Sequence, residues 1–221
     1  MKLAHPQLDA VFSTESGTVP TLVIENQSFF RSLLQDVADQ IAGMEGETVL
    51  SQNDRVLSFS KYAELIDSYL GFSLNRKPLL NKILTVLERE AVDSRHYAET
   101  VNVLSEAEQL VAELSFPFPC SLICTKLTVG ALLKSLGIEI SEEYADPLEK
   151  MLDYMELVRE FDQNKLFIFV NLRSYFPDEK VERFLESAID HEFQILLIDG
   201  REYDRLKSEE RVTVDKDLCE F

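Results

Sequence analysis

The fold is decided by the stretch LFIFVNLRSYFPDEKVERFLESAIDHEFQILLID, residues 166–199. Residues 166–170 and 195–198 are continuous apolar runs, and residues 178–190 between them carry apolar and charged side chains with helical spacing. A strand that is apolar on both faces lies in a sheet covered by helices on both sides, which is typical of parallel sheets. The stretch therefore predicts a strand, a helix and a second parallel strand, and with them an α/β fold.

The first candidate strand, residues 21–25, is not followed by a glycine-rich turn. The next residues are Asn26-Gln27-Ser28-Phe29-Phe30. Without glycines, the backbone N–H groups of such a turn do not close around a phosphate. Asn171 and Asp199 follow the other two strands, at the carboxyl edge where parallel sheets place their ligands. The sequence thus predicts a scaffold of the nucleotide-binding type that binds no nucleotide.

The remaining elements predict an α/β domain made from both ends of the chain. We assign residues 1–59 and 146–221 to this domain and residues 60–145 to an inserted helical domain. For the α/β domain we expect a helix at 27–41, a hairpin at 48–58 and a helix at 147–161. For the inserted domain we expect a helix that begins at Ser60 and continues past Ile66, one long helix or a helical hairpin at 78–115, and a short helix at 127–136.

Composition indicates an ordinary globular protein, with 221 residues of which 45% are hydrophobic. No apolar run approaches the roughly 20 residues of a membrane span, and residues 1–6 lack the features of a signal peptide. We therefore expect a cytoplasmic protein with no membrane partner. Three cysteines in a chain without an export signal are interpreted as reduced thiols rather than disulfides. Cys120 and Cys124 are interpreted as buried thiols rather than a zinc site.

The charge of the chain is strongly negative and unevenly distributed. A net charge of −18 repels nucleic acid on average. Residues 68–87 and 114–138 nevertheless contain no carboxylate, whereas residues 139–162 carry nine acidic and two basic residues. The alternative explanation is that two apolar helical stretches simply need few charges. The cations of the acid-free stretches are the candidate DNA-binding residues: Arg76, Lys77, Lys82, Lys126 and Lys134.

Two groups of carboxylates are candidate metal sites. The denser group consists of Glu139, Glu142, Glu143, Asp146 and Glu149. Calcium prefers several carboxylate and carbonyl oxygens from one flexible turn, although a solvated acidic turn followed by a helix N-terminus explains the same pattern. The second group is Asp199, Glu202 and Asp204 at the sheet edge. It would suit a metal-dependent nuclease or phosphohydrolase, and the alternative is a turn with solvated charges.

Four motifs in a fixed order carry a resemblance to a known family. They are Leu70-Gly71-Phe72-Ser73-Leu74-Asn75, Leu133-Lys134-Ser135-Leu136-Gly137, Leu166-Phe167-Ile168-Phe169-Val170-Asn171 and Arg201-Glu202-Tyr203-Asp204. With this order and spacing the chain resembles, almost end to end, the accessory spacer-acquisition protein of type II-A CRISPR systems. The resemblance implies a non-catalytic, homotetrameric ring that binds the ends of linear double-stranded DNA in a lysine-lined hole, is stabilised by calcium, and acts with the CRISPR spacer-integration complex and the RNA-guided effector nuclease. It also implies a head domain like a degenerate P-loop ATPase.

Three functions are compatible with these features of the sequence. The first is a DNA-end-binding ring, in which acid-free helices face inward and calcium cancels part of the acidic segment. The second is the metal-dependent nuclease or phosphohydrolase, which the missing phosphate loop and the lack of a clustered His/Asp/Glu signature disfavour. The third is an acidic adaptor that binds only proteins, which the basic stretches disfavour. The apolar helical insertion at 78–115 favours a homotetramer, because a monomer of this size has little with which to cover it.

Overall fold

The structure is a computed structural model that describes residues 1–221 except residues 16, 121, 126 and 163. The chain forms two compact units. The first, here called the sheet unit, comprises Met1–Phe72 and Tyr144–Phe221, and the second, the helical unit, comprises Ser73–Glu143. Within the described residues, no helix is both long and apolar enough to cross a lipid bilayer.

The sheet unit is built on a five-stranded sheet with the strand order β6-β7-β8-β3-β9. All four pairings between neighbouring strands are parallel. Its strands are β3 (Val19–Ile24), β6 (Ala63–Ile66), β7 (Leu166–Val170), β8 (Gln194–Asp199) and β9 (Glu209–Val214). Every residue of β3 and β7 is buried, as a strand covered on both faces requires. The predicted α/β fold with a mostly parallel sheet is confirmed, and its likeness to a P-loop ATPase remains a prediction.

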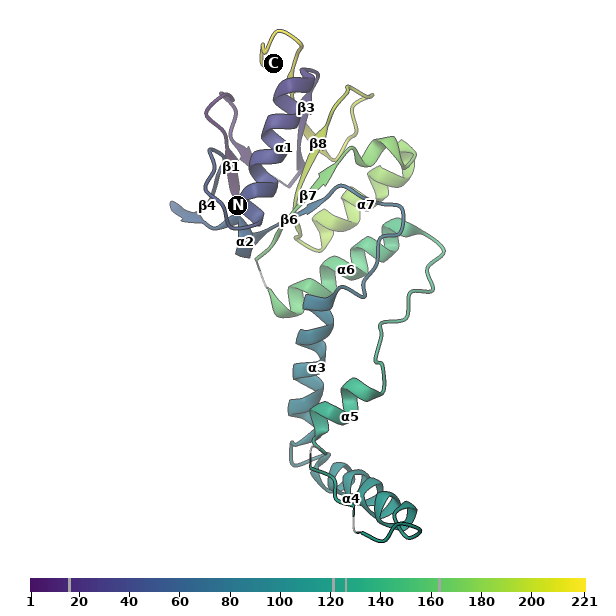
Figure 1. Cartoon of the computed structure of the whole chain (residues 1–221). Coiled ribbons are helices and arrows are strands. Elements are labelled where there is room, and N and C mark those ends of the chain that lie inside the picture. Colours follow the sequence, from purple (N-terminus) through teal and green to yellow (C-terminus); the bar gives the residue numbers. More distant parts are fainter. Residues whose placement is uncertain (16, 121, 126, 163) are drawn as a thin grey trace. The chain divides into compact units, whose positions relative to one another are not determined.

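Helices cover the two faces of this sheet (Figure 1). The helices of the sheet unit are α1 (Gln27–Ile41), α2 (Phe59–Tyr62), α6 (Pro147–Phe161) and α7 (Asp178–Asp190), together with the 3-10 turn η1 (Leu172–Ser174). On one face α1 packs Leu33 and Val37 into the core that contains Leu22 of β3. On the other face the Phe184 ring of α7 lies 5.3 Å from that of Phe169 on β7. The predicted helices at 27–41, 147–161 and 178–190 are confirmed.

A small antiparallel sheet joins the core on the α1 side. Its order is β2-β1-β4-β5, and its strands are β1 (Lys2–Ala4), β2 (Phe12–Ser13), β4 (Val49–Gln52) and β5 (Arg55–Leu57). The hairpin between β4 and β5 turns at Asn53 and Asp54, whose φ angles are 50° and 60°. Asparagine and aspartate adopt this left-handed conformation more easily than other non-glycine residues, which explains the tight turn. The predicted hairpin at 48–58 is confirmed.

The predicted helix that begins at Ser60 is wrong. Only α2 is helical, and the chain then continues as β6, in which Ala63 and Ile66 are buried. In β6, Ala63 pairs with Leu166 and Ile66 with Phe169 of β7. A short segment with apolar residues at positions 62, 65, 66 and 69 fits either period, so pairing with the neighbouring strand decides its conformation.

The helical unit contains α3 (Lys77–Ala91), α4 (Tyr97–Leu114) and α5 (Val129–Ser135). The predicted apolar stretch at 78–115 is therefore two helices, separated by residues 92–96. α5 packs against α3. A Cβ atom on Gly130 would lie 2.2 Å from Glu88 Oε1, so the glycine at the start of α5 allows the two helices to approach closely. No side chain of α4, all of whose residues are described, is buried.

Candidate functional site

The turn between β3 and α1 is where a nucleotide-binding sheet would hold phosphate. Here only Glu25 and Asn26 separate the strand from the helix. The Asn26 side chain accepts a hydrogen bond from the Phe29 N–H at 3.0 Å, and its amide donates to the Lys216 carbonyl at 2.8 Å. The side chain of Asn26 therefore satisfies a free N–H of the helix, a group that a phosphate would otherwise contact.

A hydrogen bond connects the residue after β7 with the residue after β8, at the carboxyl edge of the sheet. Asn171 has a left-handed backbone with φ 53°, and its side-chain oxygen accepts a hydrogen bond from the Gly200 N–H at 2.8 Å. A Cβ atom on Gly200 would lie 3.4 Å from that oxygen and 3.5 Å from the Phe30 ring of α1. Residues from β7, β8 and α1 thus fill this edge of the sheet closely.

The carboxylates of the second predicted metal group lie in different environments. Asp199 is buried with 1% of its surface exposed, whereas Glu202 and Asp204 are exposed. Glu202 lies 3.6 Å from Arg211, and the backbone carbonyl of Asp204 accepts a hydrogen bond from Arg173 at 2.6 Å. Burial, the largest cause, raises the pKa of Asp199 to about 7. Nowhere in the described parts of the chain do three His, Cys, Asp or Glu side chains form a group that could hold a metal ion.

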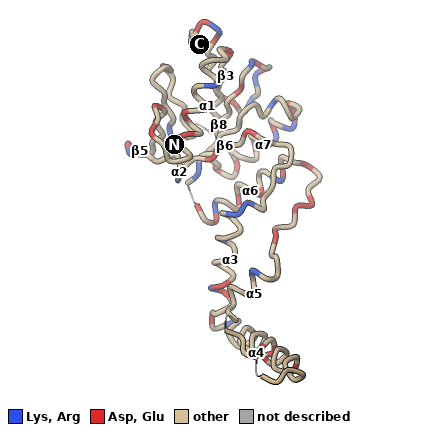
Figure 2. The backbone as a smooth tube through the Cα atoms, viewed as in Figure 1, with Lys and Arg blue, Asp and Glu red and all other residues tan. Residues whose placement is uncertain are grey.

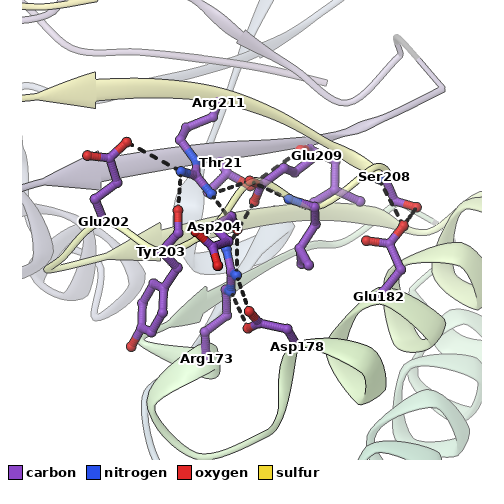
Figure 3. A network of polar contacts seen from close by, with 12 residues as sticks. Thr21, Arg173, Asp178, Glu182, Glu202, Tyr203, Asp204, Ser208, Glu209 and Arg211 are labelled. Atoms are coloured by element: carbon purple, nitrogen blue, oxygen red, sulfur yellow. Dashed lines mark hydrogen bonds and ion pairs between the residues drawn. The ribbon is translucent and has the colours of Figure 1, made fainter.

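A buried polar network holds the segment between β8 and β9, here called the crossover loop (residues 200–208). Figure 3 shows Arg173 and Arg211 pointing toward this loop and toward Glu209. The Arg173 guanidinium pairs with Asp178 at 2.8 Å and lies 4.6 Å from the centroid of the Tyr203 ring. Arg211 donates to the Tyr203 carbonyl at 2.6 Å and also bonds Glu209. The two arginines therefore satisfy the carbonyl groups of a loop that has no helix of its own.

The N–H groups of the crossover loop are satisfied by carboxylates. The Leu206 N–H donates to Glu209 at 3.0 Å, and the N–H groups of Lys207 and Ser208 donate to Glu182 at 3.0 and 3.1 Å. Parallel strands are usually connected through a helix, which provides its own hydrogen bonds. In this protein charged side chains from η1, α7 and β9 replace that helix.

The four predicted DNA-binding cations that the structure describes belong to the helical unit. Arg76 precedes α3 as its N-cap residue, Lys77 and Lys82 lie on α3, and Lys134 lies on α5, while Lys126 falls outside the described residues. Lys77 and Lys134 are exposed, and Arg76 and Lys82 are half-buried. The two acidic residues of α3, Glu88 and Glu90, come near its C-terminal end. Red segments in Figure 2 mark further acidic residues along the coil that follows α5.

Glu142, one of the predicted calcium ligands, binds the beginning of the helical unit instead. Its Oε1 atom accepts hydrogen bonds from the Ser73 hydroxyl and the Leu74 N–H, both at 2.6 Å, and from the Asn75 amide at 3.0 Å. Asn75 also exchanges two hydrogen bonds with the backbone of Ile140, at 2.7 and 3.0 Å. These contacts fasten the first residues of the helical unit to its last ones.

Asp146, a second predicted ligand, is also engaged within the chain. It accepts a hydrogen bond from the Leu148 N–H at 3.0 Å, as the N-cap of α6, and it pairs with Lys180 Nζ at 2.7 Å. The hydrogen bond from Lys180 lowers the pKa of Asp146. Glu139, Glu143 and Glu149 are exposed. The five carboxylates therefore do not fit a calcium site built from one chain.

The three cysteines are free and exposed, so the interpretation of Cys120 and Cys124 as buried thiols is wrong. Cys120 and Cys124 lie in the coil between α4 and α5, and Cys219 lies close to residue 221. None of them takes part in a core, because the segments that carry them lie outside the packed helices and strands.

The fold and its edge define a class: an α/β protein with a parallel sheet, a helical insertion and no phosphate-binding turn. Comparison with known proteins gives the family. The model of the family described as "CRISPR-associated protein (Cas_Csn2)" matches residues 40–218. The CRISPR-associated protein Csn2 of Streptococcus agalactiae is 24% identical over 224 residues, covering 98% of this chain and 96% of that protein. CRISPR-associated protein Csn2 of Enterococcus faecalis is 24% identical over 160 residues, covering 71% and 73%.

The chain belongs to the Csn2 family of CRISPR-associated proteins. The family match covers residues of both the sheet unit and the helical unit. The resemblance inferred from the four ordered motifs is confirmed, and with it a CRISPR-associated role. The structure also accounts for two residues of the first motif, Ser73 and Asn75, which contact Glu142.

Proposed function

We propose that this protein is a non-catalytic protein that binds the ends of double-stranded DNA without sequence preference. It acts in CRISPR spacer acquisition as a homotetrameric ring. Its partners there are the spacer-integration complex and the RNA-guided effector nuclease. The observation that carries the proposal is the division of charge. The helical unit holds seven basic and ten acidic residues, a net charge of −3, so the other −15 of the −18 belongs to the sheet unit. DNA contact is expected on the less acidic unit.

Contacts to phosphates account for binding without sequence preference. Lys77 and Lys134 are exposed, and Arg76 precedes α3, so cations are available at the start of one helix and on a second helix packed against it. An acidic outer surface repels DNA. In a ring of copies, DNA would therefore make favourable contacts only with the inner surface of the central channel. A duplex can enter such a channel only with one of its own ends first.

We expect tight binding to linear duplex DNA and at least tenfold weaker binding to a covalently closed circle of the same sequence. Fluorescence anisotropy at several salt concentrations measures both, and affinity for the linear form should fall by about one power of salt concentration for each phosphate neutralised. Cutting the circle once is the control, since it restores an end without changing composition. Equal affinity for the circular and linear forms contradicts threading.

Self-assembly is supported by the surface of α4. This 18-residue helix has exposed apolar side chains along its length, including Tyr97, Val103, Leu110 and Leu114. Phe116, directly after it, is 91% exposed. A monomer with this much apolar surface is expected to associate. Closed symmetric rings are a common solution for identical chains.

Calcium binding is part of the same proposal. Because Glu142 and Asp146 are engaged within the chain, the exposed carboxylates of Glu139, Glu143 and Glu149 would need oxygen atoms from another copy to complete a site. We expect the mass of a tetramer by light scattering with calcium, and a smaller mass with a chelator. A variant with glutamine at these three positions should no longer respond to calcium. A monomeric mass at micromolar concentration with calcium present contradicts the assembly.

Absence of catalysis is the final part of the proposal. Phosphoryl transfer needs an N–H cradle, a lysine and a metal-binding hydroxyl at one place. The two-residue turn from β3 to α1, capped by Asn26, offers none of these together. We expect no steady ATP turnover by the purified chain in a coupled assay, with or without linear DNA. Turnover that a single substitution in this chain abolishes would contradict the proposal.

A further inference from the structure

No hydrogen bond to the carboxylate of buried Asp199 exists among the described residues, and its Oδ1 atom is buried without a partner, as is Oε2 of Glu209. Glu209, also buried, accepts hydrogen bonds from the Leu206 N–H and from Arg211. Arg173 donates to Asp178 and to the Asp204 carbonyl. A buried carboxylate without donors is costly when it is ionised.

Strand pairing places Asp199 on a polar part of the sheet. Val23 of β3 pairs with Asp199 on one side and with Thr213 on the other, and Thr21 pairs with Arg211. Side chains two residues apart on a strand share a face, so Asp199, Thr21, Thr213 and Glu209 lie on the same face. All four are buried. The opposite face of these strands is apolar and packs into the α1 core.

Charged groups on three neighbouring segments shift the pKa of Asp199. Burial raises its pKa most, Arg173 from η1 lowers it, Glu209 from β9 raises it, and Arg211 and Arg201 lower it. Tyr69, from the segment after β6, donates its hydroxyl to the Ile66 and Val170 carbonyls rather than to Asp199. The result is a pKa of about 7, so the carboxyl changes its charge near neutral pH.

The crossover loop follows Asp199 directly in the chain and is held differently from the strands of the sheet. Its N–H and carbonyl groups are bonded to the side chains of Arg173, Arg211, Glu182 and Glu209, whereas β3, β7 and β8 are joined by continuous strand pairing. Segments held by side chains open more easily than paired central strands. The loop begins at Gly200, immediately after Asp199.

We propose that the crossover loop is a pH-dependent strap, which protonated Asp199 keeps closed and ionised Asp199 tends to open. When the loop opens, the carboxylate reaches water and regains the hydration that it lacks in the closed state. The closed state has the higher pKa, so a proton favours closure. This stabilisation is fully present below about pH 4, is lost as the pH rises toward 7, and changes no further above that.

Native-state hydrogen exchange of the full chain, measured by NMR at pH 6, 7 and 8, tests the strap. The reporters are the Leu206, Lys207 and Ser208 amides, together with the Val19 amide, which is bonded to the Ser208 carbonyl of the loop. The reference is the set of amides in the β3–β8 pairing. After correction for the intrinsic exchange rate, the opening constant of the reporters should rise about tenfold from pH 6 to pH 8. The opening constant measured at the β3–β8 amides should be smaller than that of the reporters at every pH.

Two variants decide the cause. Asp199→Asn keeps the shape of the side chain but cannot ionise, so its reporters should show no rise with pH. Asp204→Asn makes the same chemical change at an exposed position of the same loop, and it should keep the rise of the original chain. If the original chain shows no rise, if Asp199→Asn retains it, or if Asp204→Asn abolishes it, the proposal is wrong. If Asp199→Asn does not fold, the other two measurements still test the proposal. It is wrong if the original chain shows no rise with pH or if Asp204→Asn abolishes the rise.

Discussion

Replacing Arg173 with methionine is expected to lower the free energy of unfolding of the sheet unit by about 3–5 kcal/mol. The Arg173 side chain is 1% exposed, and methionine fills a similar volume without charge. The substitution leaves Glu209, whose side chain is 0% exposed, with one less cation nearby, and it leaves the Asp204 carbonyl without its shortest hydrogen bond. Glu209 keeps Arg211 as a partner but loses part of the compensation of its charge at a site without access to water, which accounts for the size of the loss.

Arg201→Met is the matched control for this prediction. The Arg201 guanidinium lies 4.5 Å from the Tyr203 ring centroid, as Arg173 does at 4.6 Å, but Arg201 is exposed. Its loss should cost less than about 1 kcal/mol. Urea denaturation of the two variants, followed by circular dichroism, measures the difference. A loss at Arg173 as small as that at Arg201 would mean that the network contributes little to stability.

The strands and helices that sequence predicts correctly are those whose pattern has one interpretation. β7 and β8 are continuous apolar runs, and α7 has apolar residues at helical spacing between them. β9 was not predicted because Glu209, Arg211 and Thr213 alternate with Glu210, Val212 and Val214, which resembles a solvated strand or a loop. β9 is in fact covered on both faces, since Glu209 and Thr213 are buried on its polar face and Val214 is buried in the α1 core on the other. Sequence carries no sign of this cover.

The candidate site could be predicted only in part, because sequence shows which charges are near one another along the chain and not which partners they meet. The acid-free stretches correctly identify a unit of low net charge. The acidic cluster gives no sign that Glu142 bonds Ser73 and Asn75, far away in sequence, or that Asp146 pairs with Lys180, and the metal site stays a prediction. The one feature of the sequence that corresponds to the buried network is the spacing of Glu209, Arg211 and Thr213 at every second position.

The largest functional effect is expected from reversing the charge of the helical unit. The variant Arg76→Glu, Lys77→Glu, Lys82→Glu, Lys134→Glu should bind linear duplex DNA roughly 1,000-fold more weakly at 0.1 M salt, if each reversal costs about 1 kcal/mol. The loss should be equal for all sequences, because phosphates carry no sequence information. The salt dependence of the remaining binding should weaken by about one unit of slope per lost contact. Fluorescence anisotropy over a salt series measures both quantities.

The total charge of the chain changes as well, so the control must change it equally. The variant Arg31→Glu, Arg55→Glu, Lys61→Glu, Lys216→Glu removes four exposed cations of the sheet unit and gives the same net charge. It should lose less than about tenfold in affinity, because long-range repulsion between exposed charges is screened at this salt concentration. The double variant Lys77→Glu, Lys134→Glu changes only exposed side chains of the helical unit and guards against a folding defect caused by the half-buried Arg76 and Lys82. If the sheet-unit control loses as much affinity as the helical-unit variant, net charge alone explains the binding and the DNA-contacting surface lies elsewhere.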